Sequence, residues 1–203
     1  MGMLERDGLS VDILESLSCK SELGLNLKKT LRHISRERME DELIRVSSWY
    51  DSQEILRELA LDLRIKSVES GMLKYDRYYP DKEISKTFND LLGFRSILDS
   101  YEEMDELRTN KLFRFADMSS GKANDDGYRG IHVYYQKDNY CYPIEIQYNT
   151  YYDRQINNWL HQYVYKQCKV DGIGRLMRNR YEAGLIRSAE EFKEVLKNVL
   201  SGL

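Results

Sequence analysis

Two carboxylates in largely apolar surroundings are the residues best suited to chemistry. Asp90 opens the apolar run 90–98 and precedes Gly93, and Glu145 stands among large apolar residues in segment 142–149. Because burying a bare carboxylate is costly, each must pair, bind a metal ion or face a cleft. Together they offer two oxygen ligands for Mg²⁺, which also takes waters and phosphate oxygens. Alternatively, Asp90 caps a turn and Glu145 lies on a solvent-facing strand surface.

Basic residues gather ahead of this apolar run. Arg64, Lys66 and Ser67 lie at the end of an expected helical stretch, and Lys74 follows further on. Such cations can clamp a polyphosphate. The alternative is that they complement a helix dipole or face water.

A glycine-flanked turn leads into an expected strand and carries two aromatic side chains. Tyr128 and His132 are an even number of residues apart, so both can face the same side. A tyrosine ring there could stack on a base, and a histidine could contact phosphate. The alternative is a hairpin corner with a buried tyrosine.

Two basic runs stand apart from these motifs. The first comprises Lys28, Lys29, Arg32, His33, Arg36 and Arg38, and the second comprises Arg175, Arg178, Arg180 and Arg187. We expect the first run to lie in one helix, with Lys28, Arg32 and Arg36 on one face at a spacing of four. Either run could contact a phosphate backbone, or could be a solvated face.

The elements that must position these residues follow from hydrophobic periodicity. Residues from about 10 to 63 are expected to be helical, 90–98 a buried strand, and 130–136 and 142–149 two strands with alternating apolar residues. Helical spacing returns after Asn149, and Ser188 with Glu191 forms the capping box of a final helix. The order predicts an α+β fold, with a central mixed sheet flanked by N- and C-terminal helices.

A two-residue turn at Asp138 and Asn139 would join the two alternating strands as a hairpin. In that register His132 lies directly opposite Glu145 on the polar face. The sequence therefore predicts an imidazole and a carboxylate in contact on one sheet face.

The composition of the chain disfavours several classes of protein. The chain has 203 residues, with 31 Lys and Arg against 34 Asp and Glu, a formal net charge of −3 and three cysteines without a close pair. A globally basic nucleic-acid binder, a disulfide framework and a thiolate zinc site are therefore disfavoured. Without a long apolar run or a signal-like N-terminus, we expect no membrane span and a cytoplasmic protein.

Five motifs in order resemble the synthetase domain of the RelA/SpoT homologue family, over about residues 40–170. They are Arg64-x-Lys66-Ser67, Asp90-x-x-Gly93-x-Arg95, Gly127-Tyr128-Arg129-x-x-His132, Glu145-x-Gln147, and finally His161 with Tyr165-Lys166. The resemblance implies a nucleotidyltransferase-like fold in a single domain, 1–203. Its catalytic core would span about 64–170, between helical parts at about 10–63 and 171–203.

The resemblance implies transfer of the β,γ-pyrophosphate of ATP to a nucleotide 3′-hydroxyl, with release of AMP. Arg64 and Arg95 would sandwich the adenine. The ATP phosphates would be bound by Lys66, Ser67 and Lys74, and Mg²⁺ by Asp90 and Glu145. Glu145 would also help to remove the proton of the attacking hydroxyl, and Gln147 would orient Glu145 or the acceptor. The acceptor would be bound by Tyr128, Arg129, His132 and His161.

The segments 126–132, 142–147 and 157–161 resemble the toxic branch of the family, and two departures from the usual pattern argue against GDP or GTP as the acceptor. Tyr148-Asn149-Thr150 follows the Glu145 motif where alarmone makers usually have an arginine, and Asn124-Asp125-Asp126 replaces a basic lead. The resemblance then implies a toxin, neutralised by a protein antitoxin, that pyrophosphorylates the CCA end of tRNA, with Lys28, Lys29, Arg32 and Arg36 contacting tRNA phosphates. The alternatives are a (p)ppGpp or (p)ppApp synthetase that uses free nucleotides, and a non-catalytic nucleotide- or RNA-binding regulator.

Overall fold

The computed structural model describes residues 2–165 and 170–202. The chain folds into two compact units, each described by itself below. Unit 1 comprises Met1–Ser96, Glu102–Phe115 and His132–Gln147, and unit 2 comprises Ile97–Tyr101, Ala116–Ile131 and Tyr148–Leu203. The expectation of a single domain stays a prediction.

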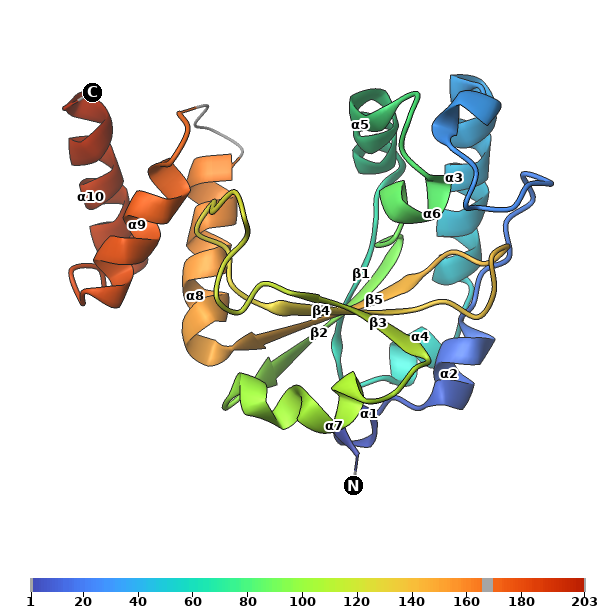
Figure 1. Cartoon of the computed structure of the whole chain (residues 1–203), viewed down its shortest axis with the longest axis horizontal. Helices are drawn as coiled ribbons and strands as arrows, with labels where there is room; N and C mark the ends of the chain where they lie inside the picture. Colours follow the sequence, from blue (N-terminus) through green and yellow to red (C-terminus); the bar gives the residue numbers. More distant parts are fainter. Residues whose placement is uncertain (1, 166–169, 203) are drawn as a thin grey trace. The chain divides into compact units, whose positions relative to one another are not determined.

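A five-stranded sheet is the central element, with the strand order β1-β2-β5-β4-β3 (Figure 1). The strands are β1 (Asp62–Ile65), β2 (Leu92–Leu98), β3 (Phe113–Asp117), β4 (Ile131–Tyr135) and β5 (Ile144–Thr150). The α+β class and the three expected strands near 90–98, 130–136 and 142–149 are confirmed. β1 was not foreseen, and its first two residues, Asp62 and Leu63, fall in the stretch expected to be helical.

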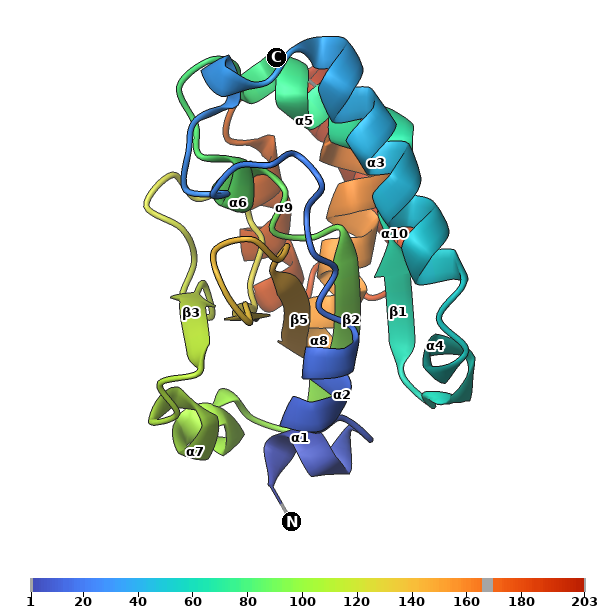
Figure 2. The same ribbon diagram turned by 90° about the vertical axis from the view of Figure 1, so that its right-hand side faces the viewer.

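The helical elements of unit 1 are short apart from two. The two longer helices are α3 (Arg36–Asp51) and α5 (Val68–Tyr78). The short ones are α1 (Met3–Arg6), α2 (Val11–Ser16), η1 (Leu31–His33), α4 (Ile55–Glu58), α6 (Ile84–Thr87) and α7 (Asp105–Arg108), and η2 (Tyr101–Met104) precedes α7. α3 and α5 pack side by side (Figures 1 and 2). A Cβ on Gly71 of α5 would come within 2.6 Å of the Leu43 side chain of α3, so the glycine permits this close approach. The packing fixes α5, which carries Lys74.

The expected continuous helical stretch 10–63 is wrong between α2 and α3. Lys28, Lys29, Arg32 and His33 lie in the loop and the short η1, and only Arg36 and Arg38 lie on α3. Turn chemistry decides the outcome: the Asn26 side chain accepts a hydrogen bond from the Lys28 amide at 2.9 Å, and Thr30 bridges to Glu83. Ser35 then caps α3, since its hydroxyl accepts from the Arg38 amide. Lys28, Arg32 and Arg36 therefore share no helix face.

The connection between β4 and β5 also differs from the expected two-residue turn. β4 and β5 are neighbours in the sheet, but residues 136–143 join them as a longer loop. Asp138 accepts hydrogen bonds from the amides of Tyr140 (2.7 Å) and Cys141 (3.1 Å). The Tyr142 amide donates to the Cys19 carbonyl rather than to β4. The hairpin turn is thus wrong, although the two strands pair as expected.

Unit 2 contains α8 (Tyr151–Trp159), a π-helical segment η3 (Leu160–Tyr165), α9 (Ile173–Glu182) and α10 (Ala189–Ser201). Its core is an apolar cluster that includes Ile156, Trp159, Met177 and Phe192. The Ser188 hydroxyl caps α10 by accepting from the Glu191 amide at 3.2 Å, as predicted. The returning bond of the capping box shifts by one residue, because the Arg187 amide donates to the Glu191 carboxylate.

No helix in the described part of the chain has the length and apolar character needed to cross a membrane.

Candidate active site

Asp90 lies between two lysines in unit 1. Lys66 follows β1, Lys74 lies on α5, and Asp90 precedes β2. The Lys66 ammonium donates to Asp90 Oδ2 at 2.8 Å, and the Lys74 ammonium donates to Asp90 Oδ1 at 2.9 Å. Both carboxylate oxygens therefore accept from a cation. The structure brings these three sequence-predicted residues together.

The protonation states of this trio follow from burial and mutual attraction. Burial alone would raise the pKa of Asp90, but Lys74 and Lys66 outweigh it and lower this pKa below its ordinary value. Burial lowers the pKa of Lys66, and the Asp90 carboxylate opposes that shift. The two amino groups converge on one carboxylate, an arrangement suited to polyphosphate.

Glu145 on β5 is the second carboxylate, and its side chain is buried. His132 Nδ1 lies 3.0 Å from Glu145 Oε1, and the Gln147 amide donates to Oε2 at 2.7 Å. The predicted contact of His132 with Glu145 is confirmed. Burial raises the pKa of Glu145, but the hydrogen bond and charge of His132, with Gln147, bring it below its ordinary value. The Glu145 carboxylate is therefore held in a fixed orientation, with one contact on each oxygen.

Tyr134 joins this group, although no motif pointed to it. Its hydroxyl lies 3.3 Å from His132 Nδ1, and the guanidinium carbon of Arg114 lies 4.3 Å from its ring centre. Burial first, and then the Glu145 carboxylate, raise the pKa of Tyr134 well above the ordinary value, so it stays neutral. The alternation of β4 places Tyr134 on the face of His132 and was the available signal.

The register of β1 and β2 positions the two arginines expected at adenine. Asp62 pairs with Arg95, and Arg64 pairs with Gly93, so Arg64 and Arg95 are diagonal neighbours on one face. Diagonal side chains stand about 7–8 Å apart. A flat ring between two planes needs about 7 Å, twice a van der Waals contact of about 3.5 Å. The spacing suits a sandwiched base, while Arg95 also contacts Asp62 at 3.5 Å.

A small cavity of about 20 Å³ connects these groups, room for about one water or a metal ion. It is lined by Arg64, Asp90, Gly93, Phe94, Arg95, Glu145 and Gln147. A Cβ on Gly93 would lie 3.7 Å from Glu145 Oε2, so the glycine leaves this oxygen open to the cavity. Ser67, by contrast, caps α5 by accepting from the Ser70 amide.

The two carboxylates fit magnesium by their donor chemistry. Asp90 and Glu145 line the same cavity and supply hard oxygen donors. Within residues 2–165 and 170–202 no group of three or more His, Cys, Asp or Glu gathers as a metal cage. The arrangement therefore suits a cation that keeps waters and takes phosphate oxygens.

Three expected acceptor residues, Tyr128, Arg129 and His161, belong to unit 2. The Asn149 amide donates to the Tyr128 hydroxyl at 3.5 Å, and Lys122 stands 5.0 Å over the Tyr128 ring. The Arg129 guanidinium donates to both oxygens of Asp125, at 2.7 and 3.0 Å. His161 is exposed on η3. Their roles at an acceptor stay predictions, and Lys166 of the last motif lies outside the described residues.

The Asp125–Arg129 pair is the strongest electrostatic feature near Tyr128. The hydrogen bond from Arg129 lowers the pKa of Asp125 to about 2, against a partial opposing effect of burial. The Arg129 guanidinium therefore directs two donors to Asp125 of the same loop, and Asp125 belongs to the segment Asn124-Asp125-Asp126.

The backbone of the Tyr128 loop is fixed by buried polar groups. Arg178, fully buried on α9, donates to the Gly127 carbonyl at 2.9 Å, to Asp153 at 2.5 Å and to Asn157 at 3.1 Å. Gly127 has φ +90°, and a Cβ there would lie 2.3 Å from the Gly174 carbonyl. Arg178 is therefore structural, and the expectation that it could contact a nucleic-acid backbone is wrong.

Acidic residues accompany the N-terminal basic run. Arg32 forms an ion pair with Asp81, and Arg36 pairs with Asp76 at 3.1 Å. Lys28 and Lys29 are exposed on the loop. The run is thus less positive than its sequence suggests, because two of its exposed arginines are paired with carboxylates.

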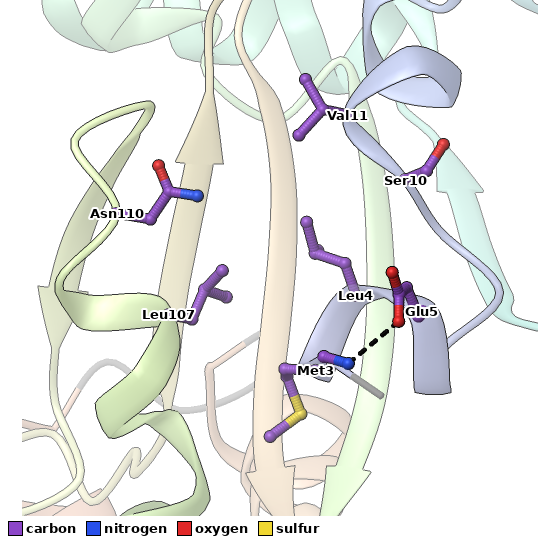
Figure 3. Close-up of a pocket in the computed structure, with 8 residues that line it drawn as sticks. Met3, Leu4, Glu5, Ser10, Val11, Leu107 and Asn110 are labelled. Atoms are coloured by element: carbon purple, nitrogen blue, oxygen red, sulfur yellow. Dashed lines mark hydrogen bonds between the residues drawn. The ribbon is translucent and has the colours of Figure 1, made fainter.

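A cavity of about 210 Å³ near the N-terminus differs in character (Figure 3). Its lining includes Met3, Leu4, Val11 and Leu107, and the Glu5 carboxylate accepts from the Gly2 amide at 3.0 Å. The described lining residues include no cation, so this cavity does not suit phosphate.

Comparison with known proteins finds similar solved structures only. No protein-family model and no curated protein matches the chain. Small alarmone synthetase 1 from Bacillus subtilis, bound to its product pppGpp, is 18% identical with a TM-score of 0.47 and covers 82% of this chain and 91% of its own. Small alarmone synthetase 2 from Bacillus subtilis is 17% identical with a TM-score of 0.44, covering 82% and 92%. A GTP pyrophosphokinase family protein from Streptococcus pneumoniae is 18% identical with a TM-score of 0.42, covering 82% and 90%. The function has to be argued from the site itself.

Proposed function

We propose that the protein transfers the β,γ-pyrophosphate of ATP to the 3′-hydroxyl of a nucleotide acceptor. The observation that carries the proposal is the single cavity shared by the Asp90 and Glu145 carboxylates and the guanidinium groups of Arg64 and Arg95. The order of five family-like motifs along the chain supports it as well. Three of these motifs, those of Arg64, Asp90 and Glu145, lie on unit 1 strands or directly beside them, and His132 of a fourth lies on β4 in the same unit.

The donor side of the reaction rests on cations. Arg64 and Arg95 hold the adenine between them, and Lys66 and Lys74 neutralise the triphosphate. Asp90 keeps both ammonium groups in place before ATP binds, since each donates to one of its oxygens. Asp90 and Glu145 would hold Mg²⁺, which supplies charge neutralisation at the phosphate oxygens when bound.

The acceptor side rests on Glu145. Its ionised carboxylate takes the proton of the 3′-hydroxyl, the oxygen forms a bond to the β-phosphorus, and the bond from that phosphorus to the α-bridging oxygen breaks to release AMP. His132 and Gln147 orient the carboxylate through one hydrogen-bonding contact on each oxygen. Positioning and charge neutralisation supply the rate enhancement.

We propose the 3′ end of tRNA as the acceptor, in a toxin neutralised by a protein antitoxin in the cytoplasm. Tyr128 stacks on the terminal adenine, and the exposed Lys28 and Lys29 bind tRNA phosphates. Asn149 supports this choice. Its amide donates to the Tyr128 hydroxyl and to the Arg129 carbonyl, so it brings no positive charge to a position near which the family usually has an arginine.

The second candidate is synthesis of an alarmone from GDP, GTP or an adenine nucleotide. It is favoured by the pairing of Arg32 with Asp81 and of Arg36 with Asp76, which reduces the positive surface available for tRNA. A small free nucleotide needs no such surface. A non-catalytic regulator would keep binding but show no transfer to any acceptor.

The test is a transfer assay with ATP labelled at the γ-position, Mg²⁺, and GDP, GTP, ATP or deacylated tRNA in separate reactions. We expect label on tRNA that is lost when the 3′-hydroxyl is oxidised beforehand. Label on a free nucleotide alone supports the alarmone alternative. Asp90→Asn should abolish transfer with every acceptor, and a near-wild-type rate would contradict the assignment.

A charge reversal tests the tRNA surface separately. Lys28→Glu with Lys29→Glu should reduce transfer to tRNA at least tenfold and make its remaining loss with rising salt less steep, because fewer counterions are released on binding, while ATP binding persists. Lys20→Glu, an exposed lysine of the same N-terminal segment, is the matched control. Unchanged transfer in the double variant would remove the two lysines from the tRNA interface.

A further inference from the structure

A second polar pocket opens on unit 1, formed where β3 lies beside β4. It has a volume of about 190 Å³, and its polar lining comes from Lys111, Arg114, Tyr134 and Gln136. Among the residues that line it there are two cations and no carboxylate. At this size the pocket suits one charged group of a larger ligand, since whole small-molecule sites occupy about 300–1,000 Å³.

The cationic wall of this pocket is already oriented. Arg114 lies over the Tyr134 ring at 4.3 Å, so one face of the guanidinium is held while its N–H edges stay available. The Gln136 amide donates to the Cys141 carbonyl at 3.0 Å, which fixes that side chain too. A planar guanidinium with fixed direction matches the oxygens of a phosphate.

The pocket also connects to the reaction centre through two side chains. Tyr134, whose ring carries Arg114, places its hydroxyl 3.3 Å from His132 Nδ1, and His132 lies 3.0 Å from Glu145. The period of two along β4 puts His132, Tyr134 and Gln136 on one face of the sheet. The pocket and the Glu145 carboxylate therefore share a face.

The strand order indicates the direction in which an acceptor would extend from Glu145 and the distance from β5 to β3, the strand that carries Arg114. The arginines proposed to hold ATP lie on β1 and β2, on one side of β5, whereas β4 and β3 lie on the other. Figure 2 shows β1 and β2 on one side of β5 and β3 on the other. Two strand spacings of about 4.8 Å place β3 about 10 Å from β5. An acceptor whose 3′-hydroxyl contacts Glu145 would therefore extend away from ATP, across β4 and toward Arg114.

We propose that Lys111 and Arg114 form a subsite for the phosphate on the 5′ side of the acceptor's reacting ribose. The inference rests on the proposed function and assigns it a binding group that no motif indicated. The phosphate has two sources with the same chemistry, the diester that joins the last two nucleotides of an RNA and the 5′-phosphates of a free nucleotide. The subsite would orient the ribose by holding its far end.

The experiment measures binding rather than transfer, so that it is independent of catalysis. The full-length protein with α,β-methylene-ATP and Mg²⁺ is titrated with two matched pairs of ligands: adenosine and the trinucleotide CCA, and guanosine and GDP. Within each pair, one member lacks the 5′-side phosphate. The variants are Arg114→Ala and Lys111→Ala, and Arg57→Ala on the exposed surface of α4 is the control.

We expect the wild type to prefer the phosphate-bearing member of at least one pair. Arg114→Ala should weaken that member about tenfold, or about 1.4 kcal/mol, with less than a twofold change for the nucleoside. Lys111→Ala should act in the same direction, and Arg57→Ala should change neither. Weaker binding of CCA by Arg114→Ala assigns the subsite to RNA, and weaker binding of GDP assigns it to a free nucleotide.

The proposal is overturned if the wild type shows no preference for phosphate, or if Arg114→Ala weakens nucleoside and phosphate-bearing ligand equally. Thermal unfolding of each variant shows whether the substitution has impaired folding. If Arg114→Ala has a folding defect, the binding result for Lys111→Ala decides the outcome. Failure of the proposed function has a different signature. In that case the labelled pyrophosphate reaches no acceptor, whatever the phosphate preference in binding.

Discussion

Arg178→Met should be the most destabilising single change in unit 2. The substitution keeps much of the side-chain volume and removes the charge and all the donors. Asp153 then loses a buried cation that stands 2.5 Å away, and the Gly127 carbonyl and Asn157 lose donors at 2.9 and 3.1 Å. Breaking a buried ion pair by removing one partner costs about 3–5 kcal/mol. For a chain of this size each kcal/mol lowers Tm by about 2–4 °C, so the expected loss is roughly 6–20 °C.

The assay is urea denaturation followed by tryptophan fluorescence, since Trp159 lies in the apolar core of unit 2. Arg175→Met, at an exposed position of the same helix, is the matched control and should change the free energy of unfolding by less than about 0.5 kcal/mol. Asp153→Asn added to Arg178→Met should recover part of the loss, because it removes the uncompensated charge. A loss below about 1 kcal/mol for Arg178→Met would refute the reasoning.

Three further predictions concern the carboxylates and the Tyr128 loop. Glu145→Gln should abolish transfer while leaving the thermal unfolding midpoint within a few degrees of the wild type, because the amide keeps the shape; a rate within tenfold of the wild type would exclude Glu145 as the proton acceptor. Since the folded-state pKa of Asp125 is depressed to about 2 by Arg129, its contribution to stability is present above about pH 4 and is lost as the pH falls toward 2. Asp125→Asn should therefore flatten the acid limb of stability measured between pH 2 and pH 5, and an unchanged limb would contradict the pairing. Gly130→Ala should destabilise the protein by about 1–3 kcal/mol, because its Cβ would lie 2.4 Å from the Asn149 amide; equal stability in chemical denaturation would disprove this contact.

Patterns set by the sheet were predictable from the sequence, and those set by turns were not. The alternation of residues 130–136 and 142–149 identified β4 and β5, and with them the contact of His132 with Glu145. The spacing of Lys28, Arg32 and Arg36 suggested a helix, but charge spacing carries no burial energy. The Asn26 turn and the Ser35 cap outweighed it.

Long-range partners account for most of the site that the sequence left open. Nothing local indicates that both Lys66 and Lys74 reach Asp90, because the contacts join residues that are 24 and 16 positions apart. The same limit hid the burial of Arg178, because Arg175 on the same helix is exposed and the spacing of the two arginines does not show which one is buried. A basic cluster in the sequence therefore says little about which cation meets solvent.

The two lysines on Asp90 give the proposed site a way to sort its ligands. Each ammonium already has an anionic partner, so a bare polyphosphate that takes both lysines leaves a buried carboxylate without a counter-charge. A polyphosphate that brings its own divalent cation avoids this penalty. The cation then pairs with Asp90, while the two lysines pair with the phosphates. In the proposed function, Asp90 would thereby disfavour anions without a bound cation and favour nucleotides that carry Mg²⁺.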